Sequence, residues 1–161
     1  MKAGDRGQGP CASKAGAREH ALDATYQGWQ DHPRWCRECL TIRDKHGVPV
    51  PLELWPAQLK LNRAIEKQRA RGKPVRIVYL KARRVSVSVA AAAEIFHCVP
   101  FLAGQHAMIV AHDLDSTKEI FDYCKQFEDT YAPFQGVIGL DPKVKDDERK
   151  LGWSNGSAIK V

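Results

Sequence analysis

The sequence lacks an uninterrupted apolar run of about 18 residues, the length that a membrane-spanning helix needs. It also lacks a basic and then apolar leader of the kind that directs secretion. Its five cysteines are odd in number and scattered, which excludes the disulfide framework of a small secreted domain. These absences predict a chain that works away from membranes, in an intracellular and reducing compartment.

A second cysteine pair is missing too. Cys36-x-x-Cys39 has the spacing of two metal ligands, but a structural zinc ion takes about four ligands. The nearby sequence offers only His32 and His46 as helpers. Two cysteines that pack on one face of a short helix are therefore favoured over a zinc site.

What is present is an ordinary globular composition with an uneven charge. The chain has 161 residues, of which 43% are apolar and 27% charged, enough for one domain with a core. Its net charge is +6, and Lys60–Arg84 carries ten basic residues against the single acid Glu66. Asp113–Asp129 holds six acids against two lysines. This asymmetry predicts a basic face suited to a polyanionic partner.

The chain divides into an arm and one folded region. Residues 1–28 are rich in Gly, Ala and charge and poor in large apolar groups, so we expect a flexible arm before a domain at 29–161. Near the start of that domain, a turn at His46–Gly47 joins two short extended pieces, and Pro49 and Pro51 keep them out of a central strand. A helix is predicted from Pro56 to Arg71.

Alternating strand and helix signals follow. Val75–Leu80 is a continuous apolar run typical of a strand buried on both faces of a parallel sheet. The alanine-rich segment Val87–Cys98 indicates a buried helix, in which His97 and Cys98 are expected to pack rather than bind metal. His106–Asp113 repeats the strand signal. The pattern predicts an α/β fold with a mainly parallel sheet and right-handed crossovers.

The last part of the chain has two signals of its own. Ser116-x-x-Glu119 is a capping box that opens a helix with a buried apolar face. Asp141–Lys150 is most simply a solvated loop, and Asn155–Gly156 predicts a hairpin turn between two extended pieces. Because the chain stops on what looks like an edge strand, we expect the domain to be incomplete at its carboxyl end.

The loop between the first predicted strand and its helix contains no glycine, although this arrangement usually cradles a phosphate. The phosphate-binding pattern is G-x-x-x-x-G-K-[ST]. If Ser88 is the final hydroxyl, Lys81 and Ser86 replace the glycines and Val87 replaces the lysine. A buried strand that runs into a core helix is therefore an alternative interpretation of this segment.

Three cations favour a phosphate site nonetheless. Lys81, Arg83 and Arg84 follow the predicted strand, at the edge where open α/β sheets bind ligands. Their burial would be costly without an anion, and the start of the next helix would direct its positive end to the same place. A solvated basic rim is the other interpretation of this cluster.

Four blocks follow one another along the chain: "CLTIRDKHGVPVPLELWPAQLKL", "RIVYLKARRVSVSVAAAAEIFH", "MIVAHDLDSTKEIFDYCKQF" and "WSNGSAIKV". In this order they resemble the blocks of the amino-terminal ATPase half of the large terminase subunit of tailed bacteriophages. Family members share a P-x-Q helix start, a strand that ends in LKARQ-x-G-x-S, a strand that ends in AHD, and an NGS-x-I strand. The resemblance covers about Trp35 to Val161. It implies a P-loop NTPase-like, three-layer α/β domain.

The resemblance also implies a function. Terminase large subunits hydrolyse ATP with Mg²⁺ to drive double-stranded DNA through a portal into a capsid, and a separate nuclease domain cuts the DNA. The implied partners are double-stranded DNA, the portal protein, the terminase small subunit and other copies in a ring. The implied location is the cytoplasm of a bacterial host.

The family's site residues carry over to matching positions here. Lys81 matches the lysine of the deviant Walker A loop, and Arg83 and Arg84 match its RQ pair, with Arg84 in place of Gln. The same loop continues through Ser86 and Val87. Ser88 matches the hydroxyl that binds Mg²⁺.

Residues outside the loop complete the implied site. Gln58 matches the glutamine that recognises adenine, and Trp55 is placed to flank the base. His112 and Asp113 match the strand-end HD, to which we assign no role beyond the shape of the pocket.

Two departures from the family pattern affect the expected activity. Ser86 replaces a glycine, and a positive φ at that position costs a non-glycine residue about 1 kcal/mol or more. The Walker B acids and the nuclease domain would lie after Val161, so we expect no catalytic residue within this chain and no useful ATP turnover. The alternatives are a catalytically inactive prophage relic that binds DNA through its basic face, and a fragment of a P-loop helicase.

Overall fold

The computed structural model of the chain describes residues 31–72, 74–80, 86–131 and 143–161. The predicted arm, residues 1–28, lies outside them. The described helices are α2 (His32–Cys39), α3 (Pro56–Arg69), α4 (Val87–Cys98) and α5 (Leu114–Tyr131). None of these four is both long enough and apolar enough to cross a bilayer.

Helix α2 begins at Asp31, whose carboxylate accepts a hydrogen bond from the Arg34 backbone N–H at 3.1 Å. Cys36 is fully buried on this helix and Cys39 is partly buried, and both are free thiols. The predicted short helix with packed cysteines is therefore confirmed.

The predicted extended pair is confirmed as an antiparallel hairpin of β1 (Thr41–Arg43) and β2 (Pro49–Pro51). Asp44 shapes its turn by accepting hydrogen bonds from two backbone N–H groups, and Gly47 adopts φ +79°. Because β2 contains two prolines, this hairpin stays a separate two-stranded sheet.

The larger sheet has four short strands in the order β3-β6-β5-β4. Their bounds are β3 (His106–Met108), β4 (Lys143–Asp146), β5 (Lys150–Trp153) and β6 (Ala158–Lys160). Only the β3–β6 pairing is parallel among those described, while β6–β5 and β5–β4 are antiparallel. The fold is α/β as predicted, but the sheet is small and mixed rather than mainly parallel.

The turn at Asn155–Gly156 explains the mixed sheet. Gly156 has φ +84°, and the Trp153 N–H donates to the Ser157 carbonyl oxygen at 3.0 Å. This confirms the predicted hairpin turn, and a turn this short joins only antiparallel strands.

The prediction of a solvated loop over Asp141–Lys150 is wrong for Lys143–Asp146, whereas residues 147–149 do form an exposed turn. Lys143–Asp146 forms the edge strand β4. Asp146 accepts from Lys125 Nζ at 2.9 Å and from Lys143 Nζ at 3.0 Å. A charged, polar sequence suits an edge strand because it discourages pairing with other chains.

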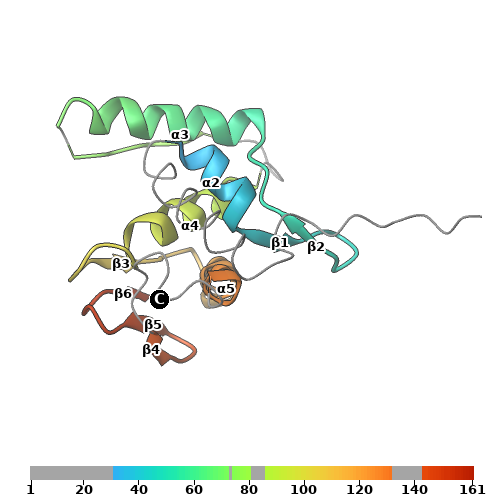
Figure 1. Cartoon of the computed structure of the whole chain (residues 1–161), viewed down its shortest axis with the longest axis vertical. Coiled ribbons are helices and arrows are strands. Elements are labelled where there is room, and N and C mark those ends of the chain that lie inside the picture. Colours follow the sequence, from blue (N-terminus) through green and yellow to red (C-terminus); the bar gives the residue numbers. More distant parts are fainter. Residues whose placement is uncertain (1–30, 73, 81–85, 132–142) are drawn as a thin grey trace, which may run out of the picture.

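The predicted central strand Val75–Leu80 is also wrong in this structure. The segment is extended but pairs with no described strand, and it lies along α3 (Figure 1). Gln68 hydrogen-bonds both the N–H and the carbonyl of Arg76. Only Ile77 and Tyr79 pack inwards, while Val78 and Leu80 are fully exposed. An apolar run alone does not reveal whether one face or both faces are covered.

Helix α5 begins earlier than the capping box at Ser116 predicts. Its first residue is Leu114, and the Asp113 carboxylate accepts from the Ser116 N–H at 2.7 Å and from its hydroxyl at 2.8 Å. Asp113 is thus the N-cap, and the strand predicted up to this residue ends at Met108.

The main core lies where α4 and α5 pack against the sheet. Phe96 of α4 is fully buried, with its ring centroid 5.9 Å from Phe127 of α5 and 6.2 Å from Trp153 of β5. The Trp153 indole N–H donates to the buried Glu128 carboxylate at 3.0 Å. Figure 1 shows α4 between α3 and the sheet.

Candidate functional site

The start of α4 has a strained backbone. Ser86 precedes its first turn with φ +49° and ψ +32°, the left-handed conformation that favours glycine. It is the one non-glycine residue with a positive φ in the described part of the chain. The phosphate-loop pattern has a glycine at this position, and Ser86 adopts the positive φ that the sequence comparison predicts there.

A cavity of about 480 Å³ opens at this end of α4. Ser86 and Ser88 line it from the α4 side. The backbone N–H groups of a first helical turn have no partners within the helix and carry partial positive charge. The volume falls within the range of small-molecule sites, and hydroxyls with helix N–H groups are chemically suited to phosphate oxygens.

Val87 and Ser88 face different surroundings. Val87 is buried with Leu61 and Ile65 in a small core between α3 and α4. Ser88 is only half-buried and lines the cavity. Val87 therefore packs α4 onto α3. The Ser88 hydroxyl, at the cavity, could hold Mg²⁺ beside a phosphate.

Gln58 reaches this region from α3. Its amide nitrogen donates to the Ser86 carbonyl at 2.7 Å, and its amide oxygen accepts from the Trp55 backbone N–H at 2.8 Å. Gln58 is buried, whereas Trp55 is 62% exposed. Gln58 thus fixes the backbone at the start of α4, and an adenine base would have to compete with both of these hydrogen bonds. Among the described residues, the cavity lining includes neither Gln58 nor Trp55.

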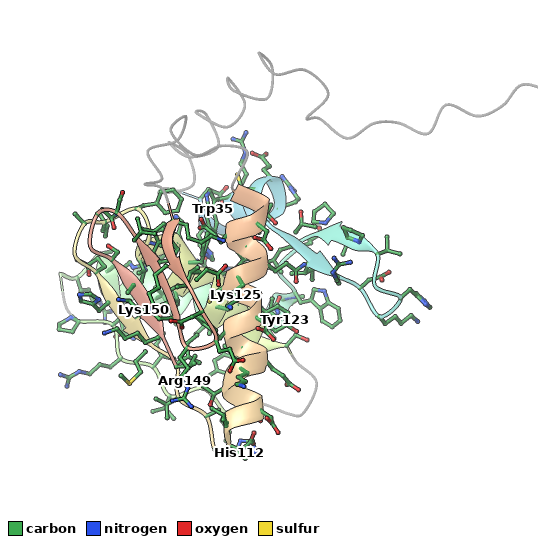
Figure 2. All side chains as sticks on the ribbon, turned by 90° about the horizontal axis from the view of Figure 1, so that it is seen from below. Trp35, His112, Tyr123, Lys125, Arg149 and Lys150 are labelled. Carbon is green, nitrogen blue, oxygen red and sulfur yellow. The ribbon has the colours of Figure 1, made fainter. Side chains whose placement is uncertain are left out.

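His112, which pairs with Asp113, forms part of another wall of the cavity. His112 Nε2 lies 2.6 Å from Asp113 Oδ2, and His112 lines the cavity. Hydrogen bonds from the Ser116 N–H and hydroxyl, and the nearby His112, hold the pKa of Asp113 below its usual value. Since Asp113 is engaged as the helix cap, it shapes the wall. Figure 2 shows His112 at the end of α5.

Sequence reasoning missed the α5 wall of the cavity. Ser116, Glu119 and Tyr123 line it from one face of that helix. Their spacing of three and then four residues was a usable signal, because it places polar groups on one helix face next to the predicted strand end. Glu119 adds a carboxylate, which suits a cation better than a bare phosphate.

The structure brings together Ser86, Ser88 and Gln58 at the start of α4. His112 lines the same cavity, and Asp113 contacts His112. The predicted cations Lys81, Arg83 and Arg84 lie outside the described residues.

Comparison with models of known protein families and with curated protein sequences gave no match.

Proposed function

We propose that this chain forms the nucleotide-binding part of a terminase large-subunit ATPase. In that role it would bind ATP with Mg²⁺ and help drive double-stranded DNA into a capsid in the cytoplasm of a bacterial host. The portal protein, the small subunit and further copies in a ring would be its partners. The ordered sequence blocks support this proposal.

The observation that carries the proposal is the left-handed Ser86 at the mouth of a cavity on the first turn of α4. A phosphate loop needs this backbone conformation, a following helix and a hydroxyl two residues on. Ser86 and Ser88 stand in that relation here, and a polar cavity of suitable size adjoins them.

Each residue has a defined task in the proposed site. Lys81 would neutralise phosphate oxygens in place of the lysine that Val87 replaces, and Arg83 and Arg84 would add positive charge. Ser88 would hold Mg²⁺, which shields the phosphate charge when bound. Gln58 would position the loop through its hydrogen bond to Ser86 and read the base beside Trp55.

The proposed function includes a P-loop fold, and two features bear on it in opposite directions. The parallel β3–β6 pair and the buried helix α4 after the loop are compatible with that fold. Val75–Leu80 lies against α3, whereas a P-loop fold places this strand in the sheet.

Nucleotide titration with a matched pair of lysine variants tests the proposal. Lys81→Ala should abolish binding of a fluorescent ATP analogue, because its charge would sit on the phosphates. Lys60→Ala, an exposed change on α3, should leave binding unchanged. Equal losses in the two variants would contradict the assignment.

Sequence-independent DNA binding without nucleotide turnover is the second candidate function. Lys60, Arg63 and Lys67 are exposed on α3 at spacings of three and four residues, so they form one basic face. This arrangement suits a phosphate backbone, and Ser86 and Val87 replace the glycine and lysine of the phosphate-loop pattern, which favours a loop that no longer binds nucleotide.

Salt dependence tests this second candidate. Affinity for a DNA duplex should fall steeply with added salt, and Gln at all three basic positions should reduce the slope of log K against log salt by about one per lost phosphate contact. An affinity that is insensitive to salt would exclude it.

A further inference from the structure

A cluster of metal-binding side chains lies away from the cavity, where the carboxyl-terminal half of α4 meets α2. It consists of His32, Glu94 and His97, each offering one nitrogen or oxygen ligand atom. These atoms all lie within 4.8 Å of one another. His32 is 4% exposed, His97 3%, and the Glu94 side chain 11%. The cluster is therefore almost entirely removed from water.

Local sequence explains how α4 provides two of these groups. Glu94 and His97 are three residues apart, so their side chains project from the same face of the helix. This Glu-x-x-His spacing is one that helices use to present a carboxylate and an imidazole to one metal ion. His32 arrives from the first turn of α2, 62 positions before Glu94 in the sequence.

The distances suit a small tetrahedral ion. Two ligand atoms that each lie about 2.0–2.1 Å from a tetrahedral Zn²⁺ are about 3.4 Å apart. His32 Nδ1 and Glu94 Oε1 are separated by 3.4 Å. The third ligand atom, a His97 ring nitrogen, lies within 4.8 Å of both, so it would have to approach them by up to about 1.4 Å to complete three ligand positions.

Neighbouring groups orient the carboxylate and the imidazole. Arg69 holds Glu94 through Oε2 at 3.3 Å, which directs Oε1 to His32. Cys36 Sγ lies 3.5 Å from His32 Nε2 and 3.8 Å from His32 Nδ1, so it contacts the same ring. Contacts of this kind around the ligands fix their orientation and raise metal affinity.

Asn62 occupies the space that the ion would enter. Its Nδ2 lies 3.3 Å from His32 Nδ1 and 3.1 Å from Glu94 Oε1. On metal binding this amide must turn or withdraw, because an N–H donor and a cation compete for the same lone pairs. Asn62 is therefore a group whose removal should favour the metal.

Packing alone explains only part of this arrangement. The His32 and His97 rings contact Trp35, with centroids 5.6 and 4.7 Å away, and this accounts for the burial of two apolar ring faces. Ring packing does not account for the largely buried Glu94 carboxylate. The competing explanation is a polar network that requires no ion: Glu94 accepts from Arg69 at 3.3 Å and from Asn62 at 3.1 Å, and lies 3.4 Å from His32 Nδ1.

We propose that His32, Glu94 and His97 form a Zn²⁺ site that fastens α2 to α4. A water molecule or the Cys36 sulfur completes its coordination. The site is separate from the cavity at the start of α4, so it binds Zn²⁺ without nucleotide. It stabilises the domain by linking helices that are far apart in sequence.

Zinc titration of the purified full chain tests this site. The wild-type chain, stripped with a chelator, should take up a single Zn²⁺ in competition with a chromophoric chelator, and its thermal unfolding midpoint should rise. Glu94→Gln and His97→Gln should each weaken binding by at least about tenfold. Asn62→Ala should leave binding as strong as in the wild type or make it stronger.

His106→Gln provides the matched control, because His106 is exposed on β3. It should leave Zn²⁺ affinity unchanged. Co²⁺ in place of Zn²⁺ should give the visible absorption bands of a tetrahedral site, with an added sulfur-to-metal band in the near ultraviolet only if Cys36 is a ligand.

Two results would overturn the proposal. One is a wild-type chain that takes up no Zn²⁺ at micromolar concentrations. The other is Zn²⁺ binding that survives both ligand substitutions in chains whose circular dichroism matches the wild type, since the ion would then be held elsewhere. If a ligand variant does not fold, the Co²⁺ spectrum of the wild type decides, because an octahedral spectrum contradicts a tetrahedral site.

Discussion

Helix α4 begins at an open polar cavity and ends in a buried cluster of histidines. At its start, Ser86 is exposed and left-handed beside a cavity of about 480 Å³. Near its end, His97 packs edge-on against both His32 and Trp35 with little solvent contact. In Figure 2, His112 marks the cavity side and Trp35 the cluster side, at opposite ends of the view.

The two ends of α4 would therefore hold a ligand in different ways. A bound anion at the open end would exchange with water and depend on loop residues that come from one stretch of sequence. An ion at the buried end would depend on residues from α2 and α4 that only the folded chain brings together. The first kind of site leaves a motif in the sequence, whereas the second leaves almost none.

The largest expected loss of stability comes from truncating Phe96, the core residue of α4 that lies between its two ends. Phe96→Ala should lower the free energy of unfolding by about 3–5 kcal/mol, because it leaves a cavity beside Phe127 and Trp153. Urea denaturation measures this loss. Leu102→Ala, at a position that is 44% exposed, should change the stability by no more than about 0.5 kcal/mol. Similar losses in the two variants would contradict the described core.

A smaller change should affect the open end alone. Gln58→Ala removes a buried amide and leaves the Ser86 carbonyl without this partner, which should cost about 1–3 kcal/mol of stability. Gln68→Ala is the control on the same helix, since Gln68 bridges to an exposed segment and should cost less than about 1 kcal/mol. Unfolding by urea compares them, and a greater loss for Gln68→Ala would refute the role of Gln58.

Glycine substitutions at two positions that are two residues apart should change the free energy of unfolding in opposite directions. Ser86→Gly relieves a positive φ and should raise the free energy of unfolding by about 1 kcal/mol. Ser88→Gly lies within the helix and should lower it by about 1 kcal/mol. Thermal unfolding of both variants checks this pair of signs, and destabilisation by Ser86→Gly would argue against the left-handed conformation.

The smallest expected effect concerns the cap at the cavity wall. Hydrogen bonds from Ser116 lower the pKa of Asp113 below 3.8, so the folded chain holds the carboxylate charged more strongly than the unfolded chain does. Its stabilising contribution is present above about pH 4 and is lost as the pH falls through the folded pKa. Asp113→Asn should therefore flatten part of the fall in unfolding midpoint between about pH 5 and pH 3. Identical pH profiles for the two chains would show that Asp113 contributes nothing through its charge.

The helices could be predicted because their ends carry local signals. Pro56 and the alanine-rich run before Cys98 gave α3 and α4 nearly their observed bounds. At α5 the pattern Ser116-x-x-Glu119 competed with Asp113, and the earlier residue won because its carboxylate accepts from both the Ser116 N–H and hydroxyl.

The sheet was less predictable because strand direction depends on connections. The Asn155–Gly156 turn fixed one antiparallel pair, but no sequence signal showed that Lys143–Asp146 would extend it. Val75–Leu80 was misplaced because its apolar residues face both ways, and only packing on α3 decides which face is covered.

The two candidate sites also differ in how far the sequence alone predicts them. Ser86 and Ser88 were identified because the loop pattern is continuous in sequence. His97 and Cys98 were expected only to pack, since no cluster of metal ligands accompanies them in the sequence. Folding of α2 onto α4 supplies His32, and no pattern of spacing between distant helices predicts that contact.

The most direct test of the central claim, that α4 begins at a phosphate site, is titration of a fluorescent ATP analogue with Mg²⁺ into the parent chain, Ser86→Gly and Lys81→Ala. The proposed function predicts that the parent binds, that Ser86→Gly binds at least as tightly because the backbone strain is relieved, and that Lys81→Ala does not bind. Failure of both the parent and Ser86→Gly to bind, or undiminished binding by Lys81→Ala, would contradict it.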